Sequence, residues 1–175
     1  VVQANLAISP ANPRRLYAAV AGADKPGPLD QARGTGGIYR SDDAGESWTL
    51  VSTDPRPTGR IGGGDLPMPI PHPKDPDTLV VASTVSWKST DGGKSWLPFK
   101  GAPGGEDYQN GWFNPENPDI MLLAADQGAV VTLNGGQTWS SWYNQPTAQM
   151  YHVIADNAFP YRVCSGQQES GSVCI

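Results

Sequence analysis

Short apolar runs recur along this chain, and each is separated from the next by residues that favour turns. The clearest examples are "SPANPRRLYAAV" (9–20), "HPKDPDTLVVAS" (72–83) and "NPENPDIMLLAA" (114–125), where a proline-marked turn precedes an apolar stretch. Asn-Pro and Asp-Pro initiate turns, and runs of this length and composition are typical of strands. No window shows a sustained 3.6-residue apolar period, so the pattern predicts strands and no long helix.

An eight-residue pattern follows in each of these regions. It is "SDDAGESW" at 41–48, "STDGGKSW" at 89–96 and "TLNGGQTW" at 132–139, with starts 48 and then 43 residues apart. The shared form is Ser/Thr-x-Asp/Asn-x-Gly-x-Ser/Thr-Trp. A repeat of this length indicates one supersecondary unit per copy.

Each copy divides into four short strands. The expected ranges are 3–9, 15–21, 37–41 and 47–52 in the first copy, 65–71, 78–83, 85–89 and 95–99 in the second, and 107–113, 119–124, 128–132 and 138–142 in the third. A fourth copy begins at about 148 and ends with its third strand. Four antiparallel strands per copy is typical of a β-propeller blade. We therefore predict an all-β fold of about three and a half blades, at about 1–53, 54–100, 101–143 and 144–175.

This number of blades does not close a ring, and an open ring exposes sheet edges. We expect the remaining blades to come from a longer chain or from another copy of this one.

The three octapeptides resemble the Asp box, or BNR repeat, found in sialidases, xyloglucanase-type glycoside hydrolases and sortilin-type receptors. The phrases "DYQNGWFNPENPDI", "SSWYNQPTAQMYHV" and "DNAFPYRVCSGQQESGS" are similar to a bacterial group of secreted, sortilin-like propellers often labelled glycosyl hydrolase. The resemblance covers nearly the whole chain, and the third box departs from it with Thr132 and Asn134. It implies a propeller fold, whereas the activity does not follow, because one repeat serves many functions.

The boxes are expected to be structural turns between the third and fourth strands. A short carboxylate or amide there accepts hydrogen bonds from backbone N–H groups of its own turn, and the glycine gives access to positive φ. A catalytic acid would not tolerate the exchange of Asp for Asn, and the ligand run and closing Glu of an EF-hand loop are missing. We assign this structural role to Ser41, Asp43, Gly45, Trp48, Ser89, Asp91, Gly93, Trp96, Thr132, Asn134, Gly136 and Trp139.

The connections between strands fall on two opposite faces of an up-and-down blade. We expect the loops joining successive blades and the loops between second and third strands to share the face away from the boxes, where propellers bind ligands. The ligand-binding candidates on that face are Arg60, Asp65, Glu106, Tyr108, Gln127, Gln167, Gln168 and Glu169. Arg56, beside Arg60, is a further candidate for holding a carboxylate ligand.

Asp107 and Asp126 are the candidate catalytic pair, because paired carboxylates perform glycoside chemistry when their separation is suitable. The alternative is that they are solvated or cap turns. A sialidase is disfavoured, because "GRIGGG" lacks the proline of the Arg-Ile-Pro phrase. We favour a binding or scaffold module over a glycoside hydrolase for this segment, since no loop carries a recognisable catalytic constellation.

The composition of the chain disfavours several classes of binding partner. The net charge of −5 and the absence of a basic patch disfavour nucleic acid, and no apolar run is long enough to span a bilayer. Two isolated histidines form no metal site by spacing, and we expect no cofactor. Cys164 and Cys174 flank a predicted hairpin and either form a disulfide, as in an oxidising compartment, or pack as reduced thiols. With the first alternative favoured, we expect a secreted or periplasmic protein that binds a glycan or a protein.

Overall fold

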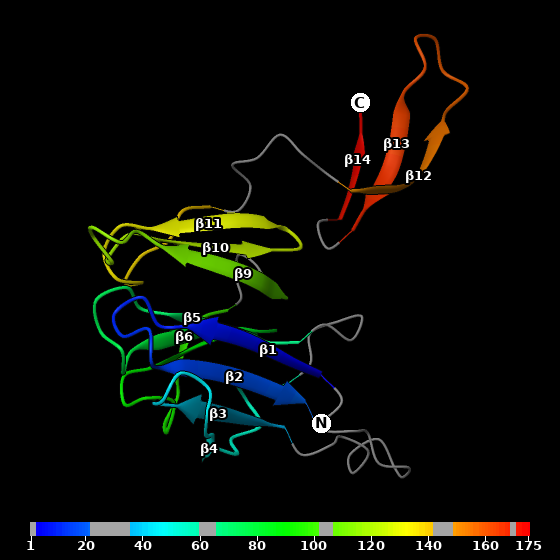
Figure 1. The fold of residues 1–175 in the computed structure, drawn as a ribbon. Coiled ribbons are helices and arrows are strands. Elements are labelled where there is room, and N and C mark those ends of the chain that lie inside the picture. The colour runs from blue at the N-terminus through cyan, green and yellow to red at the C-terminus, as the bar shows by residue number, and fades with distance from the viewer. Residues whose placement is uncertain (1–2, 22–35, 60–65, 102–106, 142–148, 169–170) are drawn as a thin grey trace, which may run out of the picture.

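The computed structural model describes residues 3–21, 36–59, 66–101, 107–141, 149–168 and 171–175. These residues form antiparallel sheets and contain no helix, as Figure 1 shows. The all-β prediction is therefore confirmed.

The strands form four sheets in chain order. The first sheet holds β1 (Gln3–Ile8), β2 (Leu16–Ala21), β3 (Gly37–Ser41) and β4 (Thr49–Ser52), and the second holds β5 (Met68–Pro71), β6 (Leu79–Ala82), β7 (Ser86–Ser89) and β8 (Leu97–Lys100). The third holds β9 (Tyr108–Phe113), β10 (Met121–Ala125) and β11 (Gly128–Thr132), and the fourth holds β12 (Met150–Ala155), β13 (Val163–Gln167) and β14 (Gly171–Cys174). Within each sheet, strands adjacent in sequence are hydrogen-bonded neighbours.

The strand predicted at 138–142 is wrong for its described residues, because 138–141 form no strand and the third sheet has three strands. Ser140 explains the difference. Its N–H donates to the Val131 carbonyl at 2.8 Å, but its hydroxyl, not its carbonyl, accepts the Val131 N–H at 2.9 Å. A side chain therefore takes the place of the backbone partner that a continuing ladder requires. The other predicted strands are present and differ only at their ends.

The core lies between successive sheets, whose first strands are neighbours: β1 contacts β5, and β5 contacts β9. One buried cluster joins the first two sheets and consists of Tyr17, Ala19, Ile38, Leu79, Val81 and Trp96. A second cluster joins the second and third sheets and consists of Ile70, Val80, Ala82, Tyr108, Phe113, Met121, Leu123 and Val130. We call the face of a sheet that packs on the preceding sheet, or its equivalent in the repeat, the leading face, and the opposite face the trailing face. This face-to-face stacking is the arrangement expected of propeller blades.

The same hydrogen bonds recur in the three octapeptide turns. In the second turn, the Ser89 hydroxyl donates to Asp91 at 2.8 Å and accepts the Gly93 N–H at 2.9 Å. Asp91 accepts the Ser95 N–H at 3.0 Å, and the Trp96 indole N–H donates to the Gly93 carbonyl at 3.1 Å. Equivalent bonds join Ser41, Asp43, Gly45, Ser47 and Trp48 in the first turn, and Thr132, Asn134, Gly136, Thr138 and Trp139 in the third.

The three tryptophans differ in burial because of what precedes each sheet. Trp96 is 3% exposed, since the first sheet covers it. Trp139 packs partly buried against the second core cluster, with its ring edge-on to Phe99. Trp48 makes the same indole hydrogen bond but is 38% exposed. The first sheet therefore leaves its leading face uncovered in this segment.

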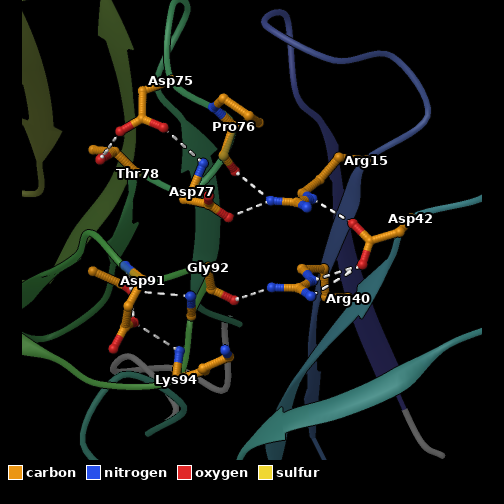
Figure 2. Close-up of polar contacts among 12 residues, drawn as sticks. Arg15, Arg40, Asp42, Asp75, Pro76, Asp77, Thr78, Asp91, Gly92 and Lys94 are labelled. Atoms are coloured by element: carbon orange, nitrogen blue, oxygen red, sulfur yellow. Dashed lines mark hydrogen bonds and ion pairs between the residues drawn. The ribbon is translucent and has the colours of Figure 1, made fainter.

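Two arginines, Arg15 and Arg40, link the first sheet to the second through ion pairs and a hydrogen bond, and we call this group of contacts the clasp (Figure 2). Arg15 pairs with Asp42 of its own sheet, with 2.5 Å between Nε and Oδ1, and with Asp77 of the second sheet. Arg40 pairs with Asp42 at 3.0 Å and donates to the Gly92 carbonyl at 3.5 Å. The arginine side chains are 15% and 19% exposed and their carboxylate partners 50% and 54%, so the clasp lies at the rim of the interface.

The fourth sheet stands apart from the other three in Figure 1, and every residue of β12 is exposed. Cys164 and Cys174 lie directly opposite each other on β13 and β14 and form a disulfide. Of the two alternatives left open by the sequence, the structure thus contains the bridge. It ties the last strand to its neighbour.

Candidate functional site

The two ends of each sheet carry different connections. At one end, the turn between the third and fourth strands bonds to the proline turn: the Gly92 N–H donates to the Asp77 carbonyl at 2.8 Å, and the Gly135 N–H to the Asp119 carbonyl at 2.9 Å. We call this the turn end. At the opposite end, which we call the loop end, the Tyr108 N–H donates to the Ser83 carbonyl at 2.9 Å and so links the third sheet to the second.

Asp107 and Asp126 lie together at the loop end of the third sheet. Tyr108 on β9 is the cross-strand partner of Ala125 on β10, so Asp107 immediately precedes one member of this pair and Asp126 immediately follows the other. Asp126 also begins the two-residue connection to β11, because Ala125 pairs with Gly128. The strand pairing therefore places these two residues next to each other at the loop end of one sheet.

Gln109 is a further residue of this site that sequence reasoning missed. The β9–β10 register shifts between Ala124 and Ala125, which leaves Gln109 as the extra residue of a bulge. Its side-chain amide donates to Asp126 at 3.3 Å. Bulges commonly re-aim a side chain next to a functional site. A bulge depends on the register between two strands, so no local pattern in the sequence indicates it.

Asp107 has an uncommon backbone conformation, with φ of +53°. Asp and Asn adopt this left-handed region more readily than most residues, and such positions cluster at functional sites. Its N–H donates to the Thr84 carbonyl at 3.3 Å, which anchors it to the second sheet. The half-buried Asp107 is thus held where two sheets meet.

Tyr108 is a correction to the predicted site. It was expected on the ligand face, but it is fully buried and packs in the second core cluster. The bulge is the cause, because it pairs Tyr108 with Ala125 and so turns the side chain toward the leading face.

Arg56, a candidate for holding a carboxylate ligand, already pairs with a carboxylate of its own loop. Its guanidinium pairs with Asp54, with Nη2 at 2.5 Å and Nε at 3.0 Å from Oδ2, and lies 4.9 Å from the centroid of the Trp87 ring. The arginine therefore braces its own loop.

The remaining candidates are distributed as follows. Gln127 is half-buried beside Asp126, and Gln167 and Gln168 lie at the β13–β14 hairpin, where the Gln168 N–H donates to the Gln149 carbonyl at 2.9 Å. Arg60, Asp65, Glu106 and Glu169 lie outside the described residues.

The carboxylates of the octapeptide turns are held by hydrogen bonds within their own turns. The Ser47 hydroxyl and N–H bind Asp43 and lower its pKa to about 2. Burial raises the pKa of Asp91, but hydrogen bonds from Ser95, Ser89 and the Lys94 N–H outweigh it and lower the pKa to about 2. Carboxyl groups that stay ionised at neutral pH are unsuited to act as general acids.

Within the described ranges, no three His, Cys, Asp or Glu residues are grouped as a metal site. A helix long and apolar enough to cross a membrane is likewise absent from those ranges.

Comparison with known proteins shows the fold. No family model matches the chain. Vacuolar protein sorting/targeting protein 10 of Mycosarcoma maydis is 36% identical over 66 residues, which is 37% of this chain and 4% of that protein. The GH74 enzyme of Niastella koreensis superposes with a TM-score of 0.62 at 19% identity, over 93% of this chain and 25% of its own.

Two further structures agree. The GH74 xyloglucanase of Xanthomonas campestris gives a TM-score of 0.55 at 16% identity, over 97% of this chain and 28% of its own. YCF48 of Cyanidioschyzon merolae gives 0.53 at 14% identity, over 98% and 52%. The chain is a β-propeller segment with an incomplete ring, and it spans about a quarter of the length of the GH74 enzymes.

Proposed function

We propose that this chain is part of an extracytoplasmic propeller of the Asp-box type that binds a glycan or a protein through the loop end of its sheets. Its blades divide at about residues 53, 100 and 143. The three octapeptide turns support the Asp-box assignment, because each has the same hydrogen bonds around an Asp or Asn. The disulfide supports an oxidising compartment such as the periplasm or the cell exterior.

The observation that carries the binding function is the group formed by Asp107, Gln109 and Asp126. A bulge at Gln109 and a left-handed backbone at Asp107 occur together at this end of the sheet, and the Gln109 amide donates to Asp126, although neither feature is needed to form the sheet. Carboxylates accept hydrogen bonds and amides both donate and accept them, which is the combination that sugar hydroxyls require. A glycan is therefore the ligand to test first.

The test is binding of the chain to an array of plant and microbial oligosaccharides that includes xyloglucan fragments, followed by calorimetry with the strongest ligand. Asp126→Ala is expected to weaken binding about tenfold or more, since truncating one partner of a charge-assisted hydrogen bond costs about 1.5–3 kcal/mol. Glu116→Ala, which removes an exposed carboxylate at the turn end, is the matched control and is expected to bind as the parent does. Equal affinity of both variants would contradict the assignment.

The second candidate is a glycoside hydrolase that uses Asp107 and Asp126, one as acid and the other as base or nucleophile. The adjacent positions of these residues favour it, because glycosidases place two carboxyl groups roughly 5–9.5 Å apart. Release of reducing ends from xyloglucan by the parent chain, abolished in Asp107→Asn and in Asp126→Asn, is the expected result for an enzyme. Binding without release of reducing ends leaves the binding module as the function.

A further inference from the structure

The trailing face of the third sheet is uncovered, whereas the same face of the first two sheets is buried. One backbone hydrogen bond recurs just before the second strand of each sheet, and it identifies the equivalent positions of the four sheets. Its donors are the N–H groups of Ser9, His72, Asn114 and Asp156, and its acceptors are, in the same order, the carbonyls of Arg15, Thr78, Ile120 and Arg162. Tyr17 and Val80 lie two residues after the acceptors Arg15 and Thr78, and the next sheet buries both side chains fully. Their equivalent on the third sheet, Leu122, is 37% exposed.

The uncovered face is apolar and continuous. Trp112 on β9 is opposite Leu122 on β10, which is opposite Val131 on β11, and the three side chains form one row. Trp112 is 54% exposed, and Leu133, which follows β11, is 70% exposed. A row of this kind marks a surface that another element covers.

The trailing face of the third sheet lacks the charged side chains that bind the second sheet to the first, so a sheet with the same charged contacts would not fit it. The positions of Arg15, Arg40 and Asp42, which clasp the first sheet to the second, are occupied in the third sheet by Ile120, Val131 and Leu133. The charges that hold Asp77 are therefore replaced by apolar side chains. The third sheet needs an apolar leading face opposite it.

The β12–β14 sheet has such a face. Val153, Ser165 and Val173 are opposite one another on β12, β13 and β14. Ser165 is equivalent to Leu123, which packs against the second sheet, so this row belongs to the leading face. Val153 is 66% exposed and finds no cover in its own sheet.

The length of chain available agrees with this pairing. Seven residues, 101–107, join β8 to β9, and they suffice to bring β9 against β5. Eight residues, 142–149, separate Ser141 from β12. A connection of nearly the same length thus precedes the fourth sheet.

We propose that the β12–β14 sheet packs its leading face on the apolar trailing face of the third sheet in the same chain. Val153 and Val173 cover Trp112 and Leu122 in this interface. The packing also carries Gln167 and Gln168 to the same end as Asp126, because the β13–β14 hairpin occupies the position of the β10–β11 hairpin in the repeat.

The test is hydroxyl-radical footprinting of the full 175-residue chain, with oxidation of each tryptophan quantified by mass spectrometry. Trp112 is expected to oxidise more slowly than Trp48, although its exposure without the partner sheet is the greater, 54% against 38%. Val153→Asp is expected to raise the Trp112 rate severalfold. Ile154→Asp, which changes the adjacent residue on the opposite face of β12, is the control and is expected to leave that rate unchanged.

Three results would overturn the proposal. The first is Trp112 oxidising faster than Trp48 in the parent chain. The second is an equal rise of the Trp112 oxidation rate in Val153→Asp and Ile154→Asp, because this would show that the whole sheet unfolds rather than that one of its faces loses its contacts. The third is protection that disappears on dilution together with a change from two-chain to one-chain mass, because the cover would then be a second copy.

Discussion

At the scale of single residues, the octapeptide turn explains why Asp and Asn are interchangeable in it. Asp91 accepts hydrogen bonds from the Ser95 hydroxyl and from the backbone N–H groups of Lys94 and Ser95. Asn134 keeps the backbone acceptor role and turns its amide toward Thr138, to which it donates at 2.8 Å. The turn thus needs one side-chain oxygen at this position and no negative charge.

This account predicts the stability of two substitutions at Asp91. Asp91→Ala leaves the N–H groups of the turn without their acceptor and is expected to lower the free energy of unfolding by about 1–2 kcal/mol. Asp91→Asn copies the third turn and is expected to cost well under half of that. Urea denaturation followed by tryptophan fluorescence measures both. An equal loss in the two variants would mean that the charge is essential.

His72 predicts a pH dependence. Its Nδ1 accepts the N–H groups of Lys74 at 3.2 Å and Asp75 at 3.0 Å, and its ring lies edge-on to Phe113 at 5.3 Å. Burial lowers the pKa of His72 below its ordinary value of 6.5, and the nearby lysines act in the same direction against two carboxylates. The folded state therefore binds fewer protons than the unfolded state just below pH 6.5.

The stability contributed by neutral His72 is thus complete above pH 6.5 and is lost as the pH falls from there toward the lowered pKa. His72→Asn provides the control, because Asn114 caps the equivalent turn with its side-chain oxygen at 2.9 Å from the Glu116 N–H. We expect the parent chain to lose more stability than His72→Asn between pH 7 and pH 5 in thermal melts. Parallel losses would remove His72 from the explanation.

At the scale of elements, Gly111 on β9 tests how tightly the second and third sheets pack. A Cβ there would lie 2.7 Å from Leu123 Cδ2 and 2.9 Å from Ile70 Cδ1. Gly111→Ala is expected to destabilise the chain by about 1–3 kcal/mol, the usual cost of overpacking a core. Gly166→Ala on β13, where no atom lies within 4 Å, is expected to stay within about 0.5 kcal/mol. Chemical denaturation of both variants makes the comparison.

The elements were predictable where their determinants are local. Strands such as β6 and β10 follow from apolar runs after proline turns, and the turn contacts of Asp43 and Asp91 span only eight residues. The predictions are wrong where pairing between strands determines the structure. The Ser140 side chain ends the ladder near 138–141, and the bulge beside Ala125 buries Tyr108 and exposes Gln109 to Asp126.

At the scale of the whole molecule, the clasp between the first two sheets is a contact that the sequence did not indicate. Arg15 and Asp77 are 62 positions apart, and nothing local marks them as a pair. Arg15→Ala removes the cation shared by the half-exposed carboxylates of Asp42 and Asp77 and is expected to cost about 1 kcal/mol. Arg14→Ala, the exposed neighbour, is expected to change stability by less than about 0.5 kcal/mol. Similar losses, measured by urea denaturation, would contradict the clasp.

The central claim is that the loop end of the third sheet binds a ligand. The most direct test is an NMR titration of the ¹⁵N-labelled chain with a xyloglucan oligosaccharide. The account predicts amide shifts at Asp107, Gln109 and Asp126, with the turns at 41–48, 89–96 and 132–139 unchanged. Shifts confined to those turns, with Asp107, Gln109 and Asp126 unchanged, would contradict it.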